Sequence, residues 1–312
     1  MKLIIICIIQ LILVPALSPF FVGIVRKVKA RLQNRRGASV FQPYSNIWKL
    51  LHKDEVISED ASWIFRFTPY LLFSITIIVG ASIPLFVTTF TNHFTGDFLV
   101  IVYLLALGTF FLALAGLDVG SAFGGFGSSR EMTVAALTEA GLVFSILVLA
   151  LTAHTTNLFA IASFIESLTL HSHAQYIPIF LAFIGFIIAL LAETGRFPFD
   201  NPSTHLELTM IHEAMILEYS GKRLALIEWA SANKFLIFIS LGANLFLPWG
   251  IANTLDSVDI FISLVLFILK VICFCVAIAV LESSIAKVRY FKIPDLLLTS
   301  FILSVIAIIL VI

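Results

Sequence analysis

Charged residues are scarce in this chain of 312 residues: Lys, Arg, Asp and Glu make up 12% of it, whereas hydrophobic residues make up 60%. A soluble core of this size cannot hide so many apolar side chains, so part of the surface must contact lipid. The formal net charge is zero, and the sequence lacks the basic patch that nucleic-acid binding requires. The composition therefore excludes an ordinary soluble protein and predicts an integral membrane protein.

Cysteine is scarce as well, because the chain has only Cys7, Cys273 and Cys275, all inside apolar runs. A cysteine in such a run is normally a small hydrophobic residue and not a disulfide partner or metal ligand. No cysteine cluster could hold an iron–sulfur centre, and no histidine pair has the spacing that holds a haem. His171 and His173 offer two possible ligands without a third. We expect no metal, no cofactor and no catalytic residue in this chain.

The apolar residues are gathered into eight continuous runs, each near the roughly 20 residues that a helix needs to cross a bilayer. The runs cover residues 3–25, 67–90, 98–117, 132–153, 176–192, 235–252, 258–281 and 293–312. Continuous runs favour helices, because the strands of a membrane barrel alternate apolar and polar residues. The predicted fold class is an all-α integral membrane protein, a single membrane domain over residues 1–312 with about eight transmembrane helices.

Positive charge is distributed unevenly between the segments that connect these runs. Seventeen of the 19 Lys and Arg residues fall on one side when the segment after the first run is placed in the cytoplasm. The positive-inside rule then predicts that both termini face the outer, periplasmic side of a bacterial inner membrane. Two long cytoplasmic loops, residues 26–66 and 193–234, hold most of the polar chemistry, and we expect an amphipathic helix in each.

The first of these loops carries Arg31, Arg35, Arg36 and Lys49 beside a short amphipathic segment with Trp48. One interpretation is a cluster that only anchors the cytoplasmic side by its charge. The other is a docking surface for a soluble partner, with the amphipathic helix lying along the membrane surface as the rim of a crevice.

The second loop is predicted to form a helix that Ser203 caps and Gly221 ends. Glu207 and Glu218 are eleven residues apart and so lie about 20° apart around the helix axis, which makes one face acidic. These carboxylates could be solvated or could pair with neighbouring Lys and Arg side chains. The many apolar residues around them argue against solvation on all sides.

Two ionisable residues lie inside the predicted spans, Glu139 in the fourth and Lys270 in the seventh. A charge near the bilayer centre costs roughly 2.5–3.5 kcal/mol on insertion scales, so neither side chain is expected to face lipid. Both are candidates for a hydrated ion path, and a structural ion pair is the alternative. Glu193 and Glu282 stand at cytoplasmic span ends.

The glycine-rich segment 120–127 is a separate feature of the sequence. It lacks the Lys-Ser/Thr ending of a phosphate-binding loop and follows an apolar span where that loop would follow a strand. We expect a flexible, close-packed turn there.

Several phrases resemble the signatures of the complex I subunit 1 family, the NuoH type, over nearly the whole chain. The main ones are Arg35-Arg-Gly37 with Gln42-Pro43 and Lys49, and Glu193-Thr-Gly-Arg-Phe-Pro-Phe-Asp200 with Glu218-Tyr-Ser-Gly221. Other phrases look more like the membrane subunit, component C, of formate hydrogenlyase and hydrogenase-4. They are the segments 116–121, 127–131, 60–62, 65–70 and 281–287.

The resemblance implies a membrane subunit that anchors a soluble electron-transfer arm and couples it to proton or sodium translocation. The implied partners, besides lipid, are soluble hydrogenase-like large and small subunits, an iron–sulfur subunit and antiporter-like membrane subunits. Iron–sulfur clusters would lie in those partners, and a nickel–iron centre there is left open. The family motifs imply a polar path through Arg130, Glu139, Glu193, Asp200, Glu207 and Glu218. We add Glu213, Lys270 and Glu282 to this path because of their positions in the chain.

Two departures from the family bear on the substrate. Ser203 and His205 stand where quinone-reducing members have further acidic residues, and the segment up to Glu218 is longer. These departures argue against a quinone site, although the quinone-site subunit of a respiratory NADH dehydrogenase stays an alternative. An alternative from another class is a stand-alone secondary ion transporter, which should show paired broken helices in two halves. The sequence shows no such repeat.

Overall fold

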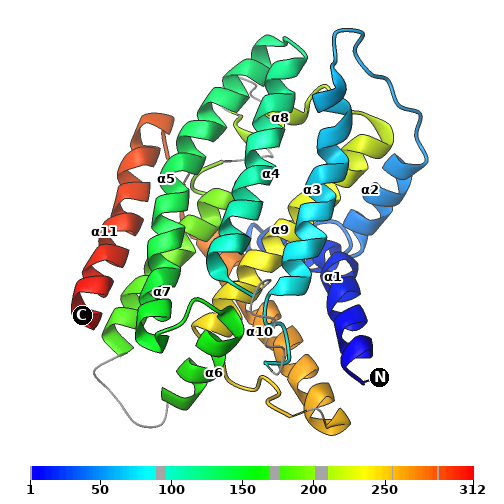
Figure 1. The fold of residues 1–312 in the computed structure, drawn as a ribbon. Coiled ribbons are helices and arrows are strands. Elements are labelled where there is room, and N and C mark those ends of the chain that lie inside the picture. The colour runs from blue at the N-terminus through cyan, green and yellow to red at the C-terminus, as the bar shows by residue number, and fades with distance from the viewer. Residues whose placement is uncertain (1, 89–95, 169–175, 201–209, 255, 287) are drawn as a thin grey trace.

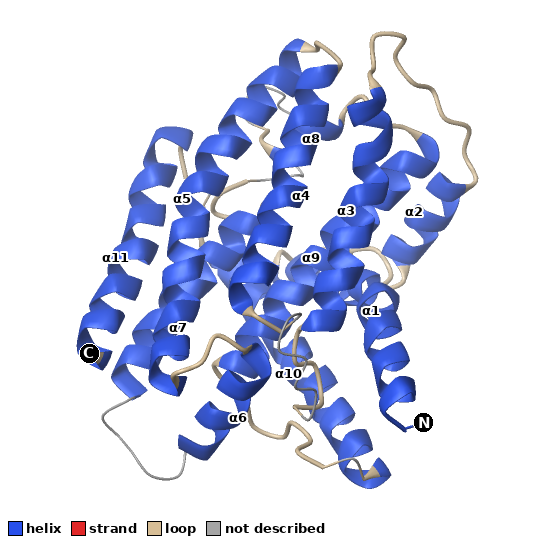
Figure 2. Cartoon of the chain, viewed as in Figure 1, coloured by secondary structure: helices blue, strands red, loops and turns tan. Residues whose placement is uncertain are grey.

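The computed structural model describes residues 2–88, 96–168, 176–200, 210–254, 256–286 and 288–312. In this described part the regular structure is helical, joined by loops and without a β-strand, and eight of its helices are long and apolar enough to cross a membrane (Figure 2). They are α1 (Lys2–Leu32), α3 (Trp63–Ser82), α4 (Phe98–Asp118), α5 (Ala122–Ala153), α7 (Tyr176–Glu193), α9 (Gly221–Leu245), α10 (Ser257–Ser284) and α11 (Ile293–Val311). The prediction of about eight spans is confirmed.

The long helices form one bundle with α9 in its interior. Helices α5, α7 and α11 pack against one another, α3 packs on α4 and α9, and α1 packs on α9 and α10 (Figure 1). The residues of α9 from Phe235 to Leu245 are all buried. A polar side chain in this stretch of α9 therefore lies among other helices and not against lipid.

The short helices mark the two ends of the bundle. Helices α2 (Gln42–Leu51) and α8 (His212–Ile216) lie at one end, which we call the α8 end, and α6 (Leu158–Leu168) lies at the other, which we call the α6 end (Figure 1). Both chain termini lie toward the α6 end. A 3-10 turn, η3 (Tyr290–Lys292), leads into α11.

The glycine-rich segment 120–127 is not the flexible turn that we predicted from the sequence. Ser121 caps α5 by accepting the N–H of Gly124 at 3.1 Å, so only Gly120, with a φ of +68°, belongs to the turn. Gly127 lies in α5, where a Cβ would come within 2.8 Å of the Cβ of Ala214. The glycines allow the start of α5 to pack closely against α8.

The start of α9 was also predicted wrongly, because the helix begins at Gly221 and not near residue 235. Its first turns carry Lys222, Arg223 and Glu228 among apolar residues, which lowers the average hydropathy that identifies a span. Lys234, which we had placed in a loop, lies in the middle of this helix. The second loop is correspondingly shorter.

The long helix predicted between Ser203 and Gly221 is not present as expected. Residues 201–209, which include Glu207, lie outside the described part, and from residue 210 onward only His212–Ile216 is helical before α9. Glu218 follows α8 as an exposed residue, so its predicted place on an acidic helix face is wrong. The difference arises because Gly221 begins a helix and does not end one.

An extended segment, residues 83–88, follows α3 and turns back into the bundle at the α6 end. Ile83, Leu85 and Phe86 are almost completely buried. The Nδ2 of Asn244 donates to the carbonyl oxygens of Pro84 and Leu85 at 2.8 and 2.7 Å. Non-helical backbone at membrane depth needs such partners, because lipid offers none.

Candidate functional site

Lys234, in the middle of α9, is the centre of a buried charged cluster. Its Nζ lies 2.7 Å from the Oε2 of Glu193, the last residue of α7, and 3.3 Å from the Oγ1 of Thr109 on α4. The two charged side chains are 19% and 7% exposed. Loss of either partner of such a pair leaves a charge that other groups or water must compensate.

Helix α5 adds two carboxylates to this cluster. Glu131 and Glu139 both interact electrostatically with Lys234 and with Glu193. Three carboxylates therefore share the field of one ammonium group. In such a group a proton or cation that joins one carboxylate changes the energy of charge on the others.

The cluster surrounds a small cavity of about 50 Å³. Glu131, Glu193, Lys234 and His212 provide ionisable groups in its wall, and Thr109 and Ser231 contribute hydroxyl groups. A cavity needs roughly 10–15 Å³ of such volume to hold one water molecule, so this cavity has room for water beside its polar groups. The cavity can therefore connect the carboxylates through water.

Helix α8 places His212 and Glu213 beside this cavity. Burial lowers the pKa of His212, while the neighbouring Glu213 acts in the opposite direction. Burial also raises the pKa of the Glu213 carboxyl, and His212 again opposes the shift. Both groups are thus biased toward their neutral forms, in which each can take up or release a proton.

A second, larger cavity of about 840 Å³ opens between α1, α2, α8 and α9. Thr194, His212, Ile227 and Ser231 line both cavities, so the two share a wall. The larger cavity is lined by charges of both signs. They include Arg26, Lys29, Arg196, Glu213, Glu228 and Glu282.

Three further predicted path residues lie around these cavities. Asp200 is 2% exposed and its Oδ2 accepts the N–H groups of Ile211 and His212 at 3.2 and 3.3 Å, so it caps α8. Arg130 donates to the carbonyl of Met210 at 3.3 Å. Glu282 forms ion pairs with cations of the larger cavity and does not line the small one.

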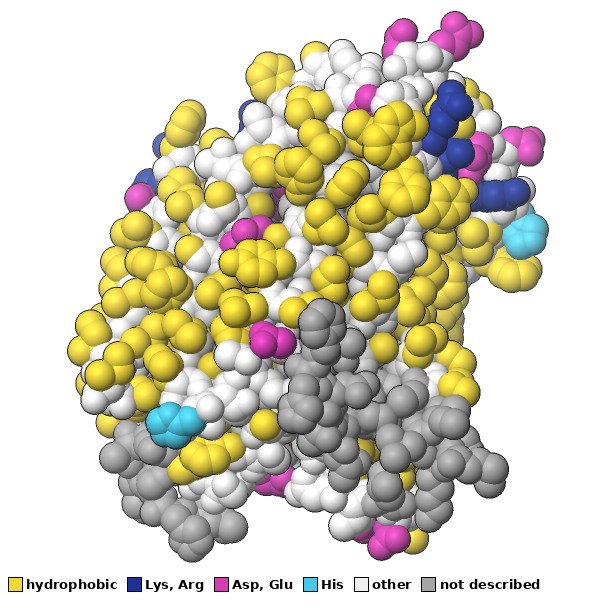
Figure 3. Space-filling view, in the orientation of Figure 1, with side chains coloured by type: hydrophobic (Ala, Val, Ile, Leu, Met, Phe, Trp, Pro, Cys, Tyr) yellow, Lys and Arg dark blue, Asp and Glu magenta, His cyan; other side chains and the backbone are white. Residues whose placement is uncertain are grey.

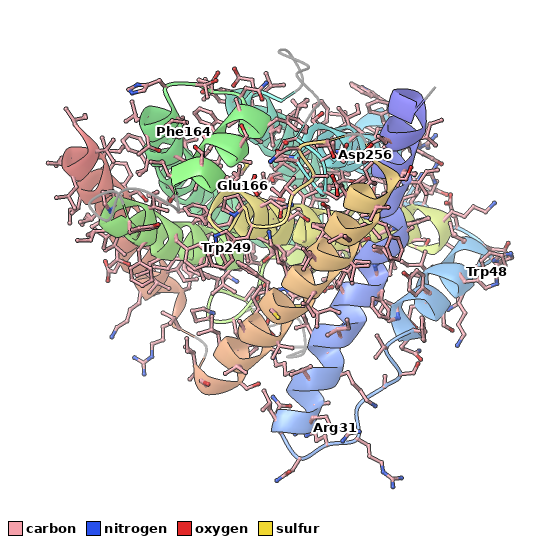
Figure 4. All side chains as sticks on the ribbon, turned by 90° about the horizontal axis from the view of Figure 1, so that it is seen from below. Arg31, Trp48, Phe164, Glu166, Trp249 and Asp256 are labelled. Atoms are coloured by element: carbon pink, nitrogen blue, oxygen red, sulfur yellow. The ribbon has the colours of Figure 1, made fainter. Side chains whose placement is uncertain are left out.

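Lys270 belongs to a different part of the molecule. Its Nζ donates to the carbonyl of Leu247 at 2.7 Å, and its charged neighbour is Glu166 on α6. Glu166 accepts a hydrogen bond from Asn253 at 3.1 Å, at the end of the bundle that Figure 4 shows from below. Glu139 and Lys270, which we had joined in one relay, therefore belong to separate groups of residues.

The four residues predicted to dock a partner, Arg31, Arg35, Arg36 and Lys49, are all exposed. The Nζ of Lys27 donates to the carbonyl of Arg36 at 3.0 Å and holds this segment near the end of α1. Figure 3 shows Lys and Arg side chains near α2, among exposed hydrophobic side chains. Figure 4 shows Arg31 at the end of α1, apart from Trp48 on α2, and of the four docking residues Arg35 lines the larger cavity.

The predicted path left out three residues of this site: Lys234, His212 and Glu131, of which the sequence places Glu131 at a cytoplasmic span end. Lys234 was overlooked because the start of α9 was placed too late. A usable signal was present, since Ser220 and Gly221 followed by a 3.6-residue apolar pattern indicate a helix start that puts Lys234 thirteen residues into the span.

Eight apolar helices around a buried lysine–glutamate cluster define a multi-pass membrane protein with an ionisable interior. The model of the NADH dehydrogenase family matches residues 3–312, and the chain belongs to this family, the complex I subunit 1 family. The resemblance noted in the sequence is confirmed, and the chain is a membrane subunit of the complex I-like type.

The relatives agree with this assignment. The chain is 36% identical to hydrogenase-4 component C of Escherichia coli (strain K12), over 98% of this chain and 95% of that protein. It is 33% identical to formate hydrogenlyase subunit 4 of the same organism, over 90% of each chain. It is 27% identical to a subunit of the NADH-quinone oxidoreductase of Paraburkholderia xenovorans (strain LB400), over 76% of this chain and 70% of the relative.

A solved structure shows the same fold. A chain of the membrane-bound sulfane sulfur reductase, an archaeal respiratory membrane complex, superposes with a TM-score of 0.83 and covers 100% of both chains at 19% identity. By their names, hydrogenase-4 component C, formate hydrogenlyase subunit 4 and the protein in this structure are parts of larger assemblies.

Proposed function

We propose that this chain is the membrane-anchoring and ion-coupling subunit of a hydrogenase-type oxidoreductase related to hydrogenase-4 and formate hydrogenlyase. It links electron transfer in a soluble arm to the movement of protons or sodium ions. The observation that carries this proposal is the Lys234–Glu193 ion pair, held at 2.7 Å beside a cavity that can contain water.

The physical basis is the coupling of charges through a medium of low dielectric. A charge that changes at the larger cavity acts on His212 and Glu213, which lie in or beside the wall that the two cavities share. These groups in turn face Asp200 and the Lys234 cluster. At separations of a few ångströms such interactions are worth several kcal/mol near a protein surface and more in its interior. Redistribution of protons is the expected response.

The positive-inside rule supports an arrangement in which the α8 end faces the cytoplasm of a bacterium and both termini face the periplasm. The larger cavity and the exposed basic residues around it would then meet a soluble arm of hydrogenase-like large and small subunits with an iron–sulfur subunit. Antiporter-like subunits would lie beside the chain in the inner membrane. Iron–sulfur clusters, and a nickel–iron centre if one is retained, belong to the arm in this proposal, which gives this chain no cofactor.

The second candidate function is that of a quinone-site subunit, and the size of the larger cavity favours it. At about 840 Å³ the cavity lies in the range of small-molecule sites. The higher identity to hydrogenase-4 component C and formate hydrogenlyase subunit 4 supports the hydrogenase branch instead. A quinone analogue that labels this subunit would favour the second candidate.

The test uses the whole complex, solubilised gently and captured through this chain. Mass spectrometry identifies its companions, and metal analysis of the same sample measures nickel and iron. Companions with nickel and iron support the hydrogenase type. Companions without nickel point to another electron route, and capture of the chain alone would revive the transporter alternative.

Ion movement is tested by Lys234→Met, with Lys222→Met as the control at the exposed start of the same helix. Uptake of protons or sodium into inverted membrane vesicles is followed with formate, then NADH, as electron donor. We expect Lys234→Met to assemble and to lower uptake by about tenfold or more, since the pair loses its only ammonium group. Lys222→Met should behave as the parent. Normal uptake by Lys234→Met would refute the proposal.

A further inference from the structure

Glu282, near the end of α10, joins three parts of the bundle. Its side chain is 5% exposed and uses both carboxylate oxygens: Oε2 lies 3.1 Å from the Nζ of Lys29 on α1, and Oε1 lies 2.8 Å from Nη1 of Arg196. Lys29 also lies over the ring of Phe197, with its Nζ 4.3 Å from the ring centroid. Arg196 lies over the ring of Phe235, with its guanidinium carbon at 3.7 Å. We call Glu282, Arg196 and Lys29 the Glu282 clasp.

Arg196 belongs to the cap that ends α7. The N–H of Arg196 donates to the carbonyl of Leu191 at 2.9 Å, and the N–H of Gly195 donates to the carbonyl of Ala192 at 3.0 Å. These two bonds and the φ of +57° at Gly195 form a Schellman motif. Glu193 is the last helical residue before this motif. The cap therefore fixes the direction of Arg196 relative to Glu193.

Arg196 reaches the Lys234 pair along two routes. Through the cap it is joined to Glu193, and through the ring of Phe235 it contacts the residue that follows Lys234 on α9. The clasp residues line the larger cavity, whereas Glu193 and Lys234 line the small one. A carboxylate on α10 is thus connected to the ion pair by a short chain of contacts.

We infer that Glu282 is a positioning residue: by holding Arg196 it fixes the end of α7 so that Glu193 stays paired with Lys234. This inference rests on the proposed function, since the position of Glu193 matters for ion movement only if the Lys234 pair takes part in it. An ion pair of this kind specifies a geometry more than it adds stability, because burying the charges costs much of what their attraction gains.

Glu282→Gln tests the inference, because it removes the charge and keeps the size of the side chain. We expect ion uptake by the assembled complex to fall about tenfold and the pH midpoint of uptake to move by about one unit, the size of a changed contact between charges. The titratable groups that face the Glu193–Lys234 pair are Glu131 and Glu139 on α5, His212 on α8 and Asp200. Glu282→Asp, which keeps the charge, should restore the midpoint in part.

The matched control is Glu55→Gln. The Oε2 of Glu55 lies 2.6 Å from Nη1 of Arg223, so this pair also joins a carboxylate to a guanidinium group, although Glu55 is 21% exposed and Glu282 only 5%. Neither residue lines either cavity. Uptake and its pH midpoint should stay unchanged in this variant. An equal shift in Glu55→Gln would mean general loosening of the fold and would overturn the inference.

A double-mutant cycle shows whether Glu282 acts through Arg196. If it does, Arg196→Gln and the double variant with Glu282→Gln should have the same uptake and midpoint, because the second change breaks only the Lys29–Glu282 pair, which in this proposal does not act on Glu193. Additive effects would overturn the inference. If Glu282→Gln fails to assemble, Arg196→Lys gives the same readout, since lysine keeps the charge but loses the planar fork.

The two proposals can fail separately. Normal uptake by Lys234→Met means that the proposed function is wrong. Loss of uptake in Lys234→Met, together with parental behaviour of Glu282→Gln and Arg196→Gln, means that only the role of Glu282 is wrong.

Discussion

The two ends of the bundle bury different kinds of polar group. At the α8 end most of these groups are charged and lie beside cavities. At the α6 end the groups around residues 83–88 are neutral and hydrogen-bond to the backbone. Lys234 and Glu193 represent the first kind, beside about 50 Å³ of space. Asn244 represents the second, with its amide donating to two carbonyl oxygens of the extended segment. Gln10 likewise donates to the carbonyl of Ile83.

The difference separates two tasks of a membrane protein. Neutral amides that bind backbone carbonyls satisfy the chain without charge and close the bundle to ions. Ionisable groups beside water can exchange protons, so their arrangement suits movement of charge. Substitutions at the α6 end should therefore change stability, and substitutions of charge at the α8 end should change ion movement.

The largest stability effect is expected for Asn244→Leu. The change removes two hydrogen bonds and leaves the carbonyls of Pro84 and Leu85 unpaired in a buried place, at about 1–3 kcal/mol each. The free energy of unfolding should fall by about 2–5 kcal/mol, measured by thermal unfolding of the complex in detergent. Asn253→Leu is the comparison: Asn253 is exposed, so loss of its hydrogen bonds with Thr88 and Glu166 should cost only about 1 kcal/mol. Parental stability of Asn244→Leu would show that the extended segment needs no such support.

Glu193→Gln tests the α8 end, where we expect a large loss of ion uptake and a small loss of stability. Without the Glu193 carboxylate, Lys234 keeps only Glu131 and Glu139 on α5 as acidic neighbours, and uptake of ions should fall about tenfold, as expected when a buried charged pair is broken. Stability should fall by only about 1–2 kcal/mol, less than for Asn244→Leu, because water in the cavity can solvate the ammonium group. Uptake in vesicles and unfolding of the same preparation give both numbers. A variant that unfolds readily yet transports normally would reverse the comparison.

The sequence predicts the spans and the family better than it predicts the polar contacts at either end. Eight spans follow from apolar runs of bilayer length, and the family follows from phrases such as Glu193-Thr-Gly-Arg. The Lys234–Glu193 contact could not be predicted, because it depends on the packing of α7 on α9. The same holds for Glu282, whose partner Lys29 is 253 residues away. The extended segment 83–88 could not be predicted either, because its apolar residues continue the apolar run of the span before it.

Glu139→Gln is expected to have a smaller effect than Glu193→Gln. Glu139 interacts with Lys234 and Glu193 electrostatically, and Lys234 keeps its direct partner in this variant. Uptake of ions should fall about threefold while assembly stays intact. This loss is smaller than the tenfold loss expected for Glu193→Gln, which corresponds to about 1.4 kcal/mol. The control is Glu166→Gln, the same substitution on α6 at the other end of the bundle, which should leave uptake unchanged. Unchanged uptake in Glu139→Gln would remove this residue from the path.

The smallest effect on stability and ion uptake is expected for Tyr219→Phe. This variant changes a neutral group at the α8 end, so it tests whether ion uptake depends on charge or only on the position of a residue in the bundle. The hydroxyl of Tyr219 donates to the carbonyl of Phe65 at 2.9 Å, and the two rings stack with centroids 3.9 Å apart. Phenylalanine keeps the stacking and loses the hydrogen bond, so stability should fall by about 1 kcal/mol. Ion uptake should not change, and a clear loss would mean that position and not charge defines the working end.

Tyr219 also gives this prediction a pH dependence. Burial raises the pKa of its phenol, so the unfolded chain releases this proton at a lower pH than the folded protein does. The contribution of the protonated phenol to stability is therefore complete below the unfolded pKa of about 10 and is lost as the pH rises above it. Unfolding measured at about pH 8 and about pH 10.5 should show a steeper loss in the parent than in Tyr219→Phe. Equal slopes would mean that the phenol is no better protected in the fold than in the unfolded chain.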